Sequence, residues 1–307
     1  MRIGEVEIRD TFAEAFGMWG ARLIITGRNR RWAREGAWNV TGFATSVIGC
    51  KLEAGIEREL DEEETPDGRP GFAVLLFAFS PDDVQARLVE RIGQSILTCP
   101  TTACFDGLPD AETRVEPGGQ VRYFGDRYQI SKLLDGRRLW RVPVMEGEFV
   151  VEEAFGVQEG VAGGNILILG RDGGAALEAA ERAVEAMRAV PSVILPFPGG
   201  VVRSGSKVGS RAYDMNATTN EAYCPTLRAM ADDTKLPEEV GSVLEIVVNG
   251  LGEEPVADAL REGARAACGP GIVAIDAGNY GGELGDHHFH LREILEGDES
   301  FPAIQVP

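Results

Sequence analysis

Two stretches of the chain, residues 23–105 and 166–275, repeat one order of apolar and polar positions. Each opens with a buried-strand pattern that ends at a Gly-Arg-Asn/Asp turn, LIITGRN at 23–29 and NILILGRD at 165–172. A helical pattern follows and leads to an apolar run, SVIGC at 46–50 and SVILPF at 192–197, which predicts a second strand. GFAVLLFAF at 71–79 then matches SVLEIVVNG at 242–250, and each precedes an acidic helix start. Each stretch therefore predicts strand, helix, strand, strand, helix, strand.

This order of elements is the split βαβ arrangement. It predicts an α+β protein with two ferredoxin-like lobes related by internal duplication. We expect one lobe at 1–150 and the other at 151–307, since 307 residues are enough for two cores. The spacing agrees, because Val84 and Val256 lie equally far along the chain from Val74 and Ile246.

The second copy carries a carboxylate where the first has an apolar side chain. When the repeats are superposed, Glu245 in VLEIVV falls on Ala73. A carboxylate buried in such a strand would be costly to desolvate unless it is paired, and burial would raise its pKa towards neutrality. Such a group suits general acid or base catalysis. Strand alternation equally allows Glu245 to lie on a solvated face, with no chemical role.

Charge and composition narrow the range of partners. A net charge of −19 argues against nucleic acid and anionic membranes, which require clustered basic residues. No apolar run approaches the roughly 20 residues of a membrane span, and the N-terminus lacks the apolar stretch of a signal peptide, so we expect a cytoplasmic protein. The five cysteines form no C-x-x-C pair and imply neither a disulfide framework nor a structural zinc site.

Motifs for common cofactors fail on context. The glycine-rich stretch at 199–210 has Ser206 where a phosphate-binding loop needs lysine, and the glycines at 160–164 precede a strand instead of following one. The three histidines, His287, His288 and His290, have no carboxylate or cysteine at ligand spacing. We therefore expect neither a metal nor a prosthetic group.

Segments rich in Gly, Thr and Asn stand at the ends of predicted strands, at 98–107, 195–209, 216–226 and 277–285. Pro198 keeps the chain extended, while Gly199 and Gly200 allow a ligand to approach the backbone closely. Thr, Asn and Tyr side chains offer neutral hydrogen bonds of the kind that orient an amide or a heterocycle. The alternative is that these segments are ordinary turns and strand ends.

Taken together, these segments resemble one family, formylmethanofuran:tetrahydromethanopterin formyltransferase. The motifs that carry the resemblance follow the family in order: DTFAEAF at 10–16, EAGIE at 53–57, ETPDGRPGF at 64–72, LTCPTTA at 97–103, GVAGGN at 160–165, PFPGGVV at 196–202, SGSKVG at 204–209, ATTN at 217–220, CPTL at 224–227 and AGNYGG at 277–282. The match spans nearly the whole chain. The segment DHHFHLREI is not shared in this way, so no role passes to the histidines.

The resemblance implies a two-lobed enzyme that assembles as a homotetramer and has no prosthetic group. Its reaction would be formyl transfer between formylmethanofuran, or a methylofuran relative, and a ring nitrogen of tetrahydromethanopterin. The family's candidate proton-transfer glutamate falls on Glu245. The expected substrate-binding residues are Thr101, Thr102, Pro198, Gly199, Gly200, Ser206, Lys207, Thr218, Thr219, Asn220, Asn279 and Tyr280. In methylotrophic bacteria the family works within a formyltransferase/hydrolase complex, so hydrolase subunits are further expected partners.

Two other functions stay open from the sequence. A noncatalytic scaffold subunit of such a hydrolase complex would keep the fold without the chemistry. A ligand-binding module would use the pterin cleft as a sensor. Turnover by the purified chain distinguishes both from an enzyme.

Overall fold

The computed structural model describes residues 1–296, so residues 297–307 of the expected second lobe lie outside the described part. The helices are α1 (Arg30–Thr41), α2 (Val47–Cys50), α3 (Pro81–Arg91), α4 (Pro117–Val121), α5 (Gly173–Arg188), α6 (Glu253–Ala267) and α7 (Leu291–Glu296). The strands are β1 (Arg2–Ile3), β2 (Val6–Ile8), β3 (Phe12–Thr26), β4 (Thr45–Ser46), β5 (Leu52–Leu60), β6 (Gly71–Ala78), β7 (Ala103–Asp106), β8 (Thr113–Val115), β9 (Ile130–Leu134), β10 (Arg137–Val144), β11 (Gly147–Glu152), β12 (Phe155–Gly170), β13 (Val193–Ile194), β14 (Ser206–Val208), β15 (Ala217–Thr219), β16 (Ser242–Gly250), β17 (Ile272–Asp276) and β18 (His287–His290). The architecture is mixed α/β in two lobes, and no helix within residues 1–296 is long and apolar enough to cross a membrane.

The repeated Gly-Arg-Asn/Asp turns begin the first helix of each lobe. The Asn29 side chain accepts a hydrogen bond from the Trp32 N–H at the start of α1, and the Asp172 side chain accepts one from the Ala175 N–H at the start of α5. An N-cap oxygen satisfies a backbone donor that the helix leaves unpaired. The two caps explain why the strand gives way to a helix at the same point in both copies.

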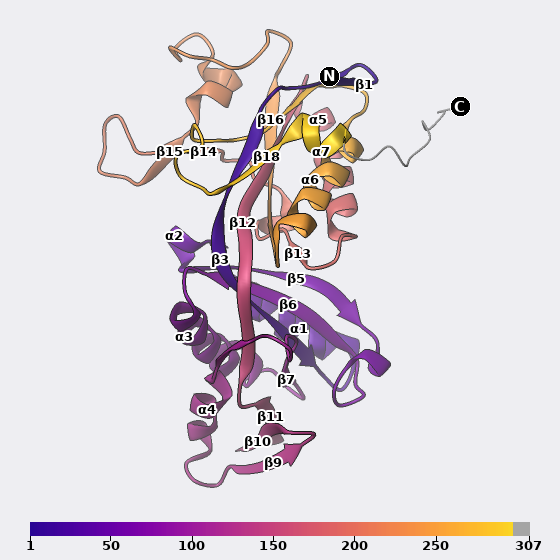
Figure 1. Ribbon diagram of the computed structural model, residues 1–307, viewed down its shortest axis with the longest axis vertical. Coiled ribbons are helices and arrows are strands. Elements are labelled where there is room, and N and C mark those ends of the chain that lie inside the picture. Colours follow the sequence, from indigo (N-terminus) through magenta and orange to yellow (C-terminus); the bar gives the residue numbers. More distant parts are fainter. Residues whose placement is uncertain (297–307) are drawn as a thin grey trace.

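Two long strands connect the lobes. The middle parts of β3 and β12 pair antiparallel from Val157 opposite Ala21 to Ala162 opposite Phe16. Figure 1 shows both strands passing from the upper lobe into the lower one, with α5 and α6 in the upper lobe and β9 to β11 at the lower end. One sheet of 16 strands therefore passes through both lobes.

The lobes share a strand order and a register. In the N-terminal lobe β6 lies between β5 and β3, which pairs with β7; in the C-terminal lobe β16 lies between β13 and β12, which pairs with β17. Ala73 stands opposite Ile24, and Glu245 stands opposite Leu167. Ile24 and Leu167 lie equally far before the two Gly-Arg turns. The predicted superposition of Glu245 on Ala73 is therefore confirmed by the pairing.

One predicted strand is wrong. Residues 46–50 of the apolar run SVIGC form the end of β4 and the one-turn helix α2, and the second strand of the lobe is β5. The helix ends at Lys51, whose φ of 67° turns the chain into β5. The true strand alternates apolar residues with charged ones, so its signal was weaker than that of the run before it.

Each lobe has its own apolar core, and the chain's first residues join the second one. The side chains of Val84 and Val256 are buried in the N-terminal and the C-terminal core, respectively. Val6 and Ile8 pack in the C-terminal core, where β2 pairs parallel to β17.

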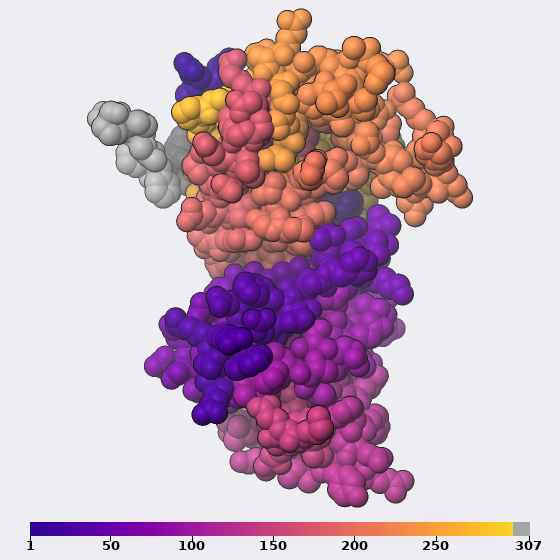
Figure 2. All heavy atoms as spheres, turned by 180° about the vertical axis from the view of Figure 1, so that it is seen from behind, coloured from indigo at the N-terminus to yellow at the C-terminus, as the bar shows by residue number. Residues whose placement is uncertain are grey.

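Residues 203–235, which we call the arm, leave the C-terminal sheet between β13 and β16. Within the arm, β14 and β15 make a separate two-stranded sheet. In Figure 2 a hollow lies between the orange arm and the violet N-terminal lobe, with indigo and yellow segments at its floor.

Candidate active site

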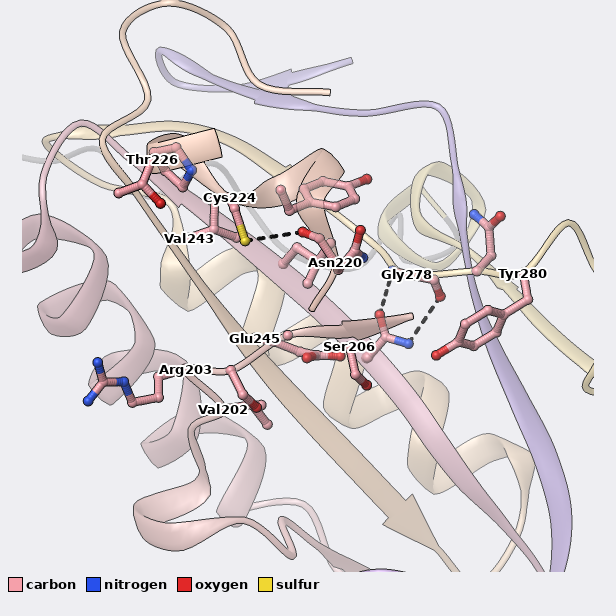
Figure 3. A pocket seen from close by; sticks show the side chains of 17 residues that line it. Val202, Arg203, Ser206, Asn220, Cys224, Thr226, Val243, Glu245, Gly278 and Tyr280 are labelled. Atoms are coloured by element: carbon pink, nitrogen blue, oxygen red, sulfur yellow. Dashed lines mark hydrogen bonds between the residues drawn. The ribbon is translucent and has the colours of Figure 1, made fainter. Parts of the chain in front are cut away.

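Glu245 lies in a cavity of about 150 Å³ in the C-terminal lobe (Figure 3). Its walls come from β12, β16, the arm and the loop that follows β17. The lining residues are Asn165, Leu167, Val202, Arg203, Ser204, Gly205, Ser206, Asn220, Tyr223, Cys224, Pro225, Thr226, Val243, Glu245, Gly278, Asn279 and Tyr280. Four segments that are distant in the sequence therefore meet around one carboxylate.

The environment of Glu245 favours its neutral form. Burial raises the pKa of this carboxyl from 4.5 to about 7. Within residues 1–296 the Glu245 side chain has neither an ion-pair partner nor a hydrogen-bond partner, so nothing offsets the cost of burying the charge. A carboxyl with a pKa near neutrality exchanges a proton in either direction at physiological pH. This environment excludes the fully solvated strand face that alternation alone allowed.

The backbone of Glu245 fixes one wall of the cavity. The Glu245 N–H donates to the Val202 carbonyl oxygen over 3.0 Å, and the Val202 N–H donates back to the Glu245 carbonyl oxygen over 2.7 Å. This bridge holds the start of the arm beside the carboxylate. Figure 3 shows Ser206 next to Glu245 and Arg203 directed away from it.

The opposite wall is the loop at 277–285. The Gly278 N–H donates to the Asn165 Oδ1 over 2.6 Å, and the Asn165 Nδ2 donates to the Gly278 carbonyl oxygen over 3.1 Å. The Tyr280 hydroxyl points towards the middle of the cavity in Figure 3. Burial raises the pKa of the Tyr280 phenol, and the charges of Glu245 and Glu14 raise it further. The phenol therefore stays protonated near neutral pH and is available as a donor.

A third wall joins the arm to β17. The Tyr223 hydroxyl donates to the Asp276 Oδ2 over 2.9 Å, and Arg9 forms an ion pair with the same oxygen. Burial, followed by the nearby Asp276 charge, raises the pKa of Tyr223. This cluster holds the second half of the arm over the cavity.

The structure brings some of the predicted site residues together and places others elsewhere. Ser206, Asn220, Asn279 and Tyr280 line the cavity with Glu245. Lys207, Thr218 and Thr219 line a neighbouring hollow on the arm, where Lys207 forms an ion pair with Glu221.

The remaining predicted residues lie outside both hollows. Pro198 and Gly199 line a groove between the lobes, and Gly200 is buried beside it, where an added Cβ would lie 2.9 Å from the Val184 Cγ2. Thr101 and Thr102 belong to the N-terminal lobe, and Thr102 donates to the Ile96 carbonyl oxygen over 2.6 Å. The substrate-binding residues predicted from the sequence therefore lie in four different places in the fold.

Two residues that hold the cavity had no predicted role. Asn165 orients Gly278, and Glu14 binds the loop at 277–285 from β3. Glu14 has apolar neighbours on both sides in β3, and Asn165 is the polar residue within the apolar stretch 160–170 of β12, which is the same signal that singled out Glu245. Among residues 1–296, no group of three or more His, Cys, Asp or Glu side chains is placed to hold a metal ion.

Two family models together match almost the entire described chain. The model for formylmethanofuran-tetrahydromethanopterin formyltransferase matches residues 1–144, and the model for the FTR proximal lobe matches residues 147–294. The chain belongs to the formylmethanofuran-tetrahydromethanopterin formyltransferase family. The earlier resemblance is therefore confirmed.

Members of this formyltransferase family from several organisms are similar over their full length. The formylmethanofuran--tetrahydromethanopterin formyltransferase of Methylobacillus flagellatus is 54% identical, over 96% of this chain and 100% of that protein. The solved formyltransferase/hydrolase complex from Methylorubrum extorquens with methylofuran contains a chain that is 50% identical, with a TM-score of 0.93 over 96% of this chain and 99% of that one. The enzyme from Methanosarcina barkeri is 47% identical, with a TM-score of 0.91 over 96% and 100%.

Proposed function

We propose that this chain transfers a formyl group between formylmethanofuran, or a methylofuran relative, and a ring nitrogen of tetrahydromethanopterin. The observation that carries the proposal is the unpartnered Glu245, with its pKa raised to about 7, in a cavity lined by hydroxyl and amide groups. The names of relatives that are similar over their full length identify the two carriers. The test is turnover: the purified chain should move the formyl group between both carriers with no added cofactor.

Each step of this acyl transfer needs a group that the cavity provides. The pterin nitrogen attacks the formyl carbon and forms a tetrahedral oxyanion, and ionised Glu245 takes the proton that the attacking nitrogen loses. The hydroxyls of Tyr280 and Ser206 are the donors we assign to the oxyanion. When the intermediate collapses, the bond to the furan carrier's nitrogen breaks and protonated Glu245 returns its proton to the departing amine. Glu245 thus ends in the state in which it began.

The two alternatives are weaker. A scaffold subunit would have no reason to maintain a desolvated carboxylate without a partner, because such a group costs stability. A sensor module requires binding without chemistry, and binding of tetrahydromethanopterin without formyl transfer would establish it. A purified chain that transfers no formyl group would refute the enzymatic proposal, whether or not it binds tetrahydromethanopterin.

We also propose that the lobes are ferredoxin-like and arose by duplication, with the units at 1–150 and 151–307. The matching strand orders β5–β6–β3–β7 and β13–β16–β12–β17 support this, as does the common register around Ala73 and Glu245. The chain ends are exceptions, because β2 extends the C-terminal sheet and β18 pairs with β3.

Lys207 is expected to bind a carboxylate or phosphate on one carrier's tail. In the structure its ammonium group pairs with Glu221, which also pairs with Arg211 over 3.1 Å, so a ligand anion would compete with an internal one. Lys207→Ala should raise the KM for that carrier more than it lowers kcat, because the contact is equal in ground and transition states. Steady-state kinetics with each carrier varied measures this, with Lys132→Ala on the distant strand β9 as the control. A fall in kcat at unchanged KM would contradict the assignment.

We propose a homotetramer, and a relative's structure as a formyltransferase/hydrolase complex supports hydrolase subunits as further partners. Because copies with a net charge of −19 repel one another, screening by salt should strengthen an association driven by apolar burial. Sedimentation velocity from low salt to about 0.5 M should therefore show a larger assembled fraction at higher salt, since the screening length falls well below its roughly 10 Å value at 0.1 M. A fully active monomer at every salt concentration would refute this. A cytoplasmic location stays a prediction from the sequence.

A further inference from the structure

The loop at 277–285 carries three cavity residues, Gly278, Asn279 and Tyr280, yet has almost no regular structure of its own. It is rich in glycine, and Gly281 and Gly282 have φ values of 80° and 77°. The described residues of this loop form no helix or strand after β17 ends at Asp276. The position of the Tyr280 hydroxyl therefore depends on contacts from other elements.

Glu14 makes four of these contacts, more than any other side chain of residues 1–296. It lies on β3, its residue is 1% exposed, and its carboxylate accepts four backbone hydrogen bonds from the loop. The Tyr280 and Gly282 N–H groups donate to Oε2 over 2.6 and 3.0 Å. The Leu284 and Gly285 N–H groups donate to Oε1 over 2.6 and 2.7 Å. Each oxygen thus fixes one part of the loop.

The charge state of Glu14 fits this role. Burial alone would raise the pKa of its carboxyl, but the four backbone donors outweigh burial and hold the pKa below its usual value. Glu14 therefore stays ionised as an acceptor for all four N–H groups. Glu245, in the cavity on the other side of this loop, has no such donors, and burial raises its pKa to about 7. One carboxylate beneath the loop thus holds the backbone, and another inside the cavity is available to move a proton.

Neighbouring contacts act on the same loop but reach less of it. The Asn279 Nδ2 donates to the Thr11 Oγ1 over 3.0 Å, and the His288 Nε2 lies 2.9 Å from the Gly285 carbonyl oxygen. His288 stands opposite Glu14 in the pairing of β18 with β3. Among residues 1–296, Glu14 is the side chain that binds both Tyr280 and the far end of the loop.

We propose that Glu14 is a positioning residue for formyl transfer: by binding the 280–285 backbone from β3, it holds the Tyr280 hydroxyl in the cavity opposite Glu245. The inference rests on the proposed function, and Glu14 itself touches no substrate. A displacement of a reacting or stabilising group by about 1 Å can cost on the order of 100-fold in rate.

Glu14→Gln tests the proposal, because a glutamine amide keeps the size but offers one acceptor oxygen in place of two. We expect kcat to fall by about 10- to 100-fold with a smaller change in KM for either carrier. A lower melting temperature is expected as well, so the loss of rate is not sufficient evidence by itself. Glu14→Asp keeps the charge and should give an intermediate loss; it replaces the glutamine variant if that variant does not fold.

A double-mutant cycle with Tyr280→Phe separates positioning from stability. If Glu14 acts through Tyr280, removing the hydroxyl should cost much less in the Glu14 variant than in the wild type. Glu152→Gln is the matched control, since Glu152 is also buried and accepts from a backbone N–H, but in the N-terminal lobe. Its effect should add to that of Tyr280→Phe.

Two outcomes would refute the positioning role: additive effects of the Glu14 variant and Tyr280→Phe, or an unchanged rate for Tyr280→Phe alone. Turnover by the wild-type chain is measured first and separately. A wild type without formyl transfer would refute the proposed function, whereas additivity in an active wild type would refute only the role of Glu14.

Discussion

Glu245→Gln should retain the fold and the affinity for both carriers while kcat falls by roughly 100-fold or more, the usual scale for loss of a general acid or base. The amide fills the same space in the cavity but neither accepts the proton of the attacking nitrogen nor protonates the departing amine. Because that proton transfer belongs to the transition state, the loss should appear in kcat and leave KM nearly constant.

Steady-state kinetics and carrier binding by calorimetry check this result. Glu159→Gln is a suitable control, since it makes the same chemical change at an exposed position of β12, the strand that pairs with β16. An unchanged kcat for Glu245→Gln would leave Glu245 with a structural role alone.

The second large effect is on pH dependence. If ionised Glu245 accepts the first proton, kcat/KM in the direction from formylmethanofuran should rise with pH up to about 7 and fall roughly tenfold per unit below it. In Glu245→Gln this limb should be absent from the residual rate. A wild-type limb centred near the ordinary carboxyl pKa of 4.5 would contradict the assignment.

Stability should change in the opposite direction over the same range. The pKa of Glu245 is raised on folding from 4.5 to about 7, so its contribution to stability is fully present below pH 4.5 and is lost as the pH rises through 7. The glutamine variant lacks this loss. The difference in melting temperature, glutamine variant minus wild type, should therefore be larger at pH 8 than at pH 5. The same difference at both pH values would refute the burial of the Glu245 charge.

The sequence by itself determined the repeat and the position of its exceptional residue. Strand alternation, the capping residues Asn29 and Asp172 and the spacing to Val84 and Val256 are local patterns, so they survive without knowledge of the fold. They were enough to place Glu245 on Ala73, which the pairing with Leu167 and Ile24 confirmed. They failed at 46–50, where a short apolar helix has the same composition as a buried strand.

Only the tertiary structure decided which polar segments share a cavity. Asn165 meets Gly278, and Glu14 meets the 280–285 loop, across separations that no local periodicity encodes. The segments that line the cavity resemble in composition the segments that carry Thr101 and Gly199, yet Thr101 and Gly199 lie in other parts of the molecule. Composition shows that a loop is able to bind something, but the pairing of β3, β12 and β16 fixes which loops face Glu245. The raised pKa likewise needs the burial of its carboxyl by the arm and the loop, and burial is a property of the folded chain.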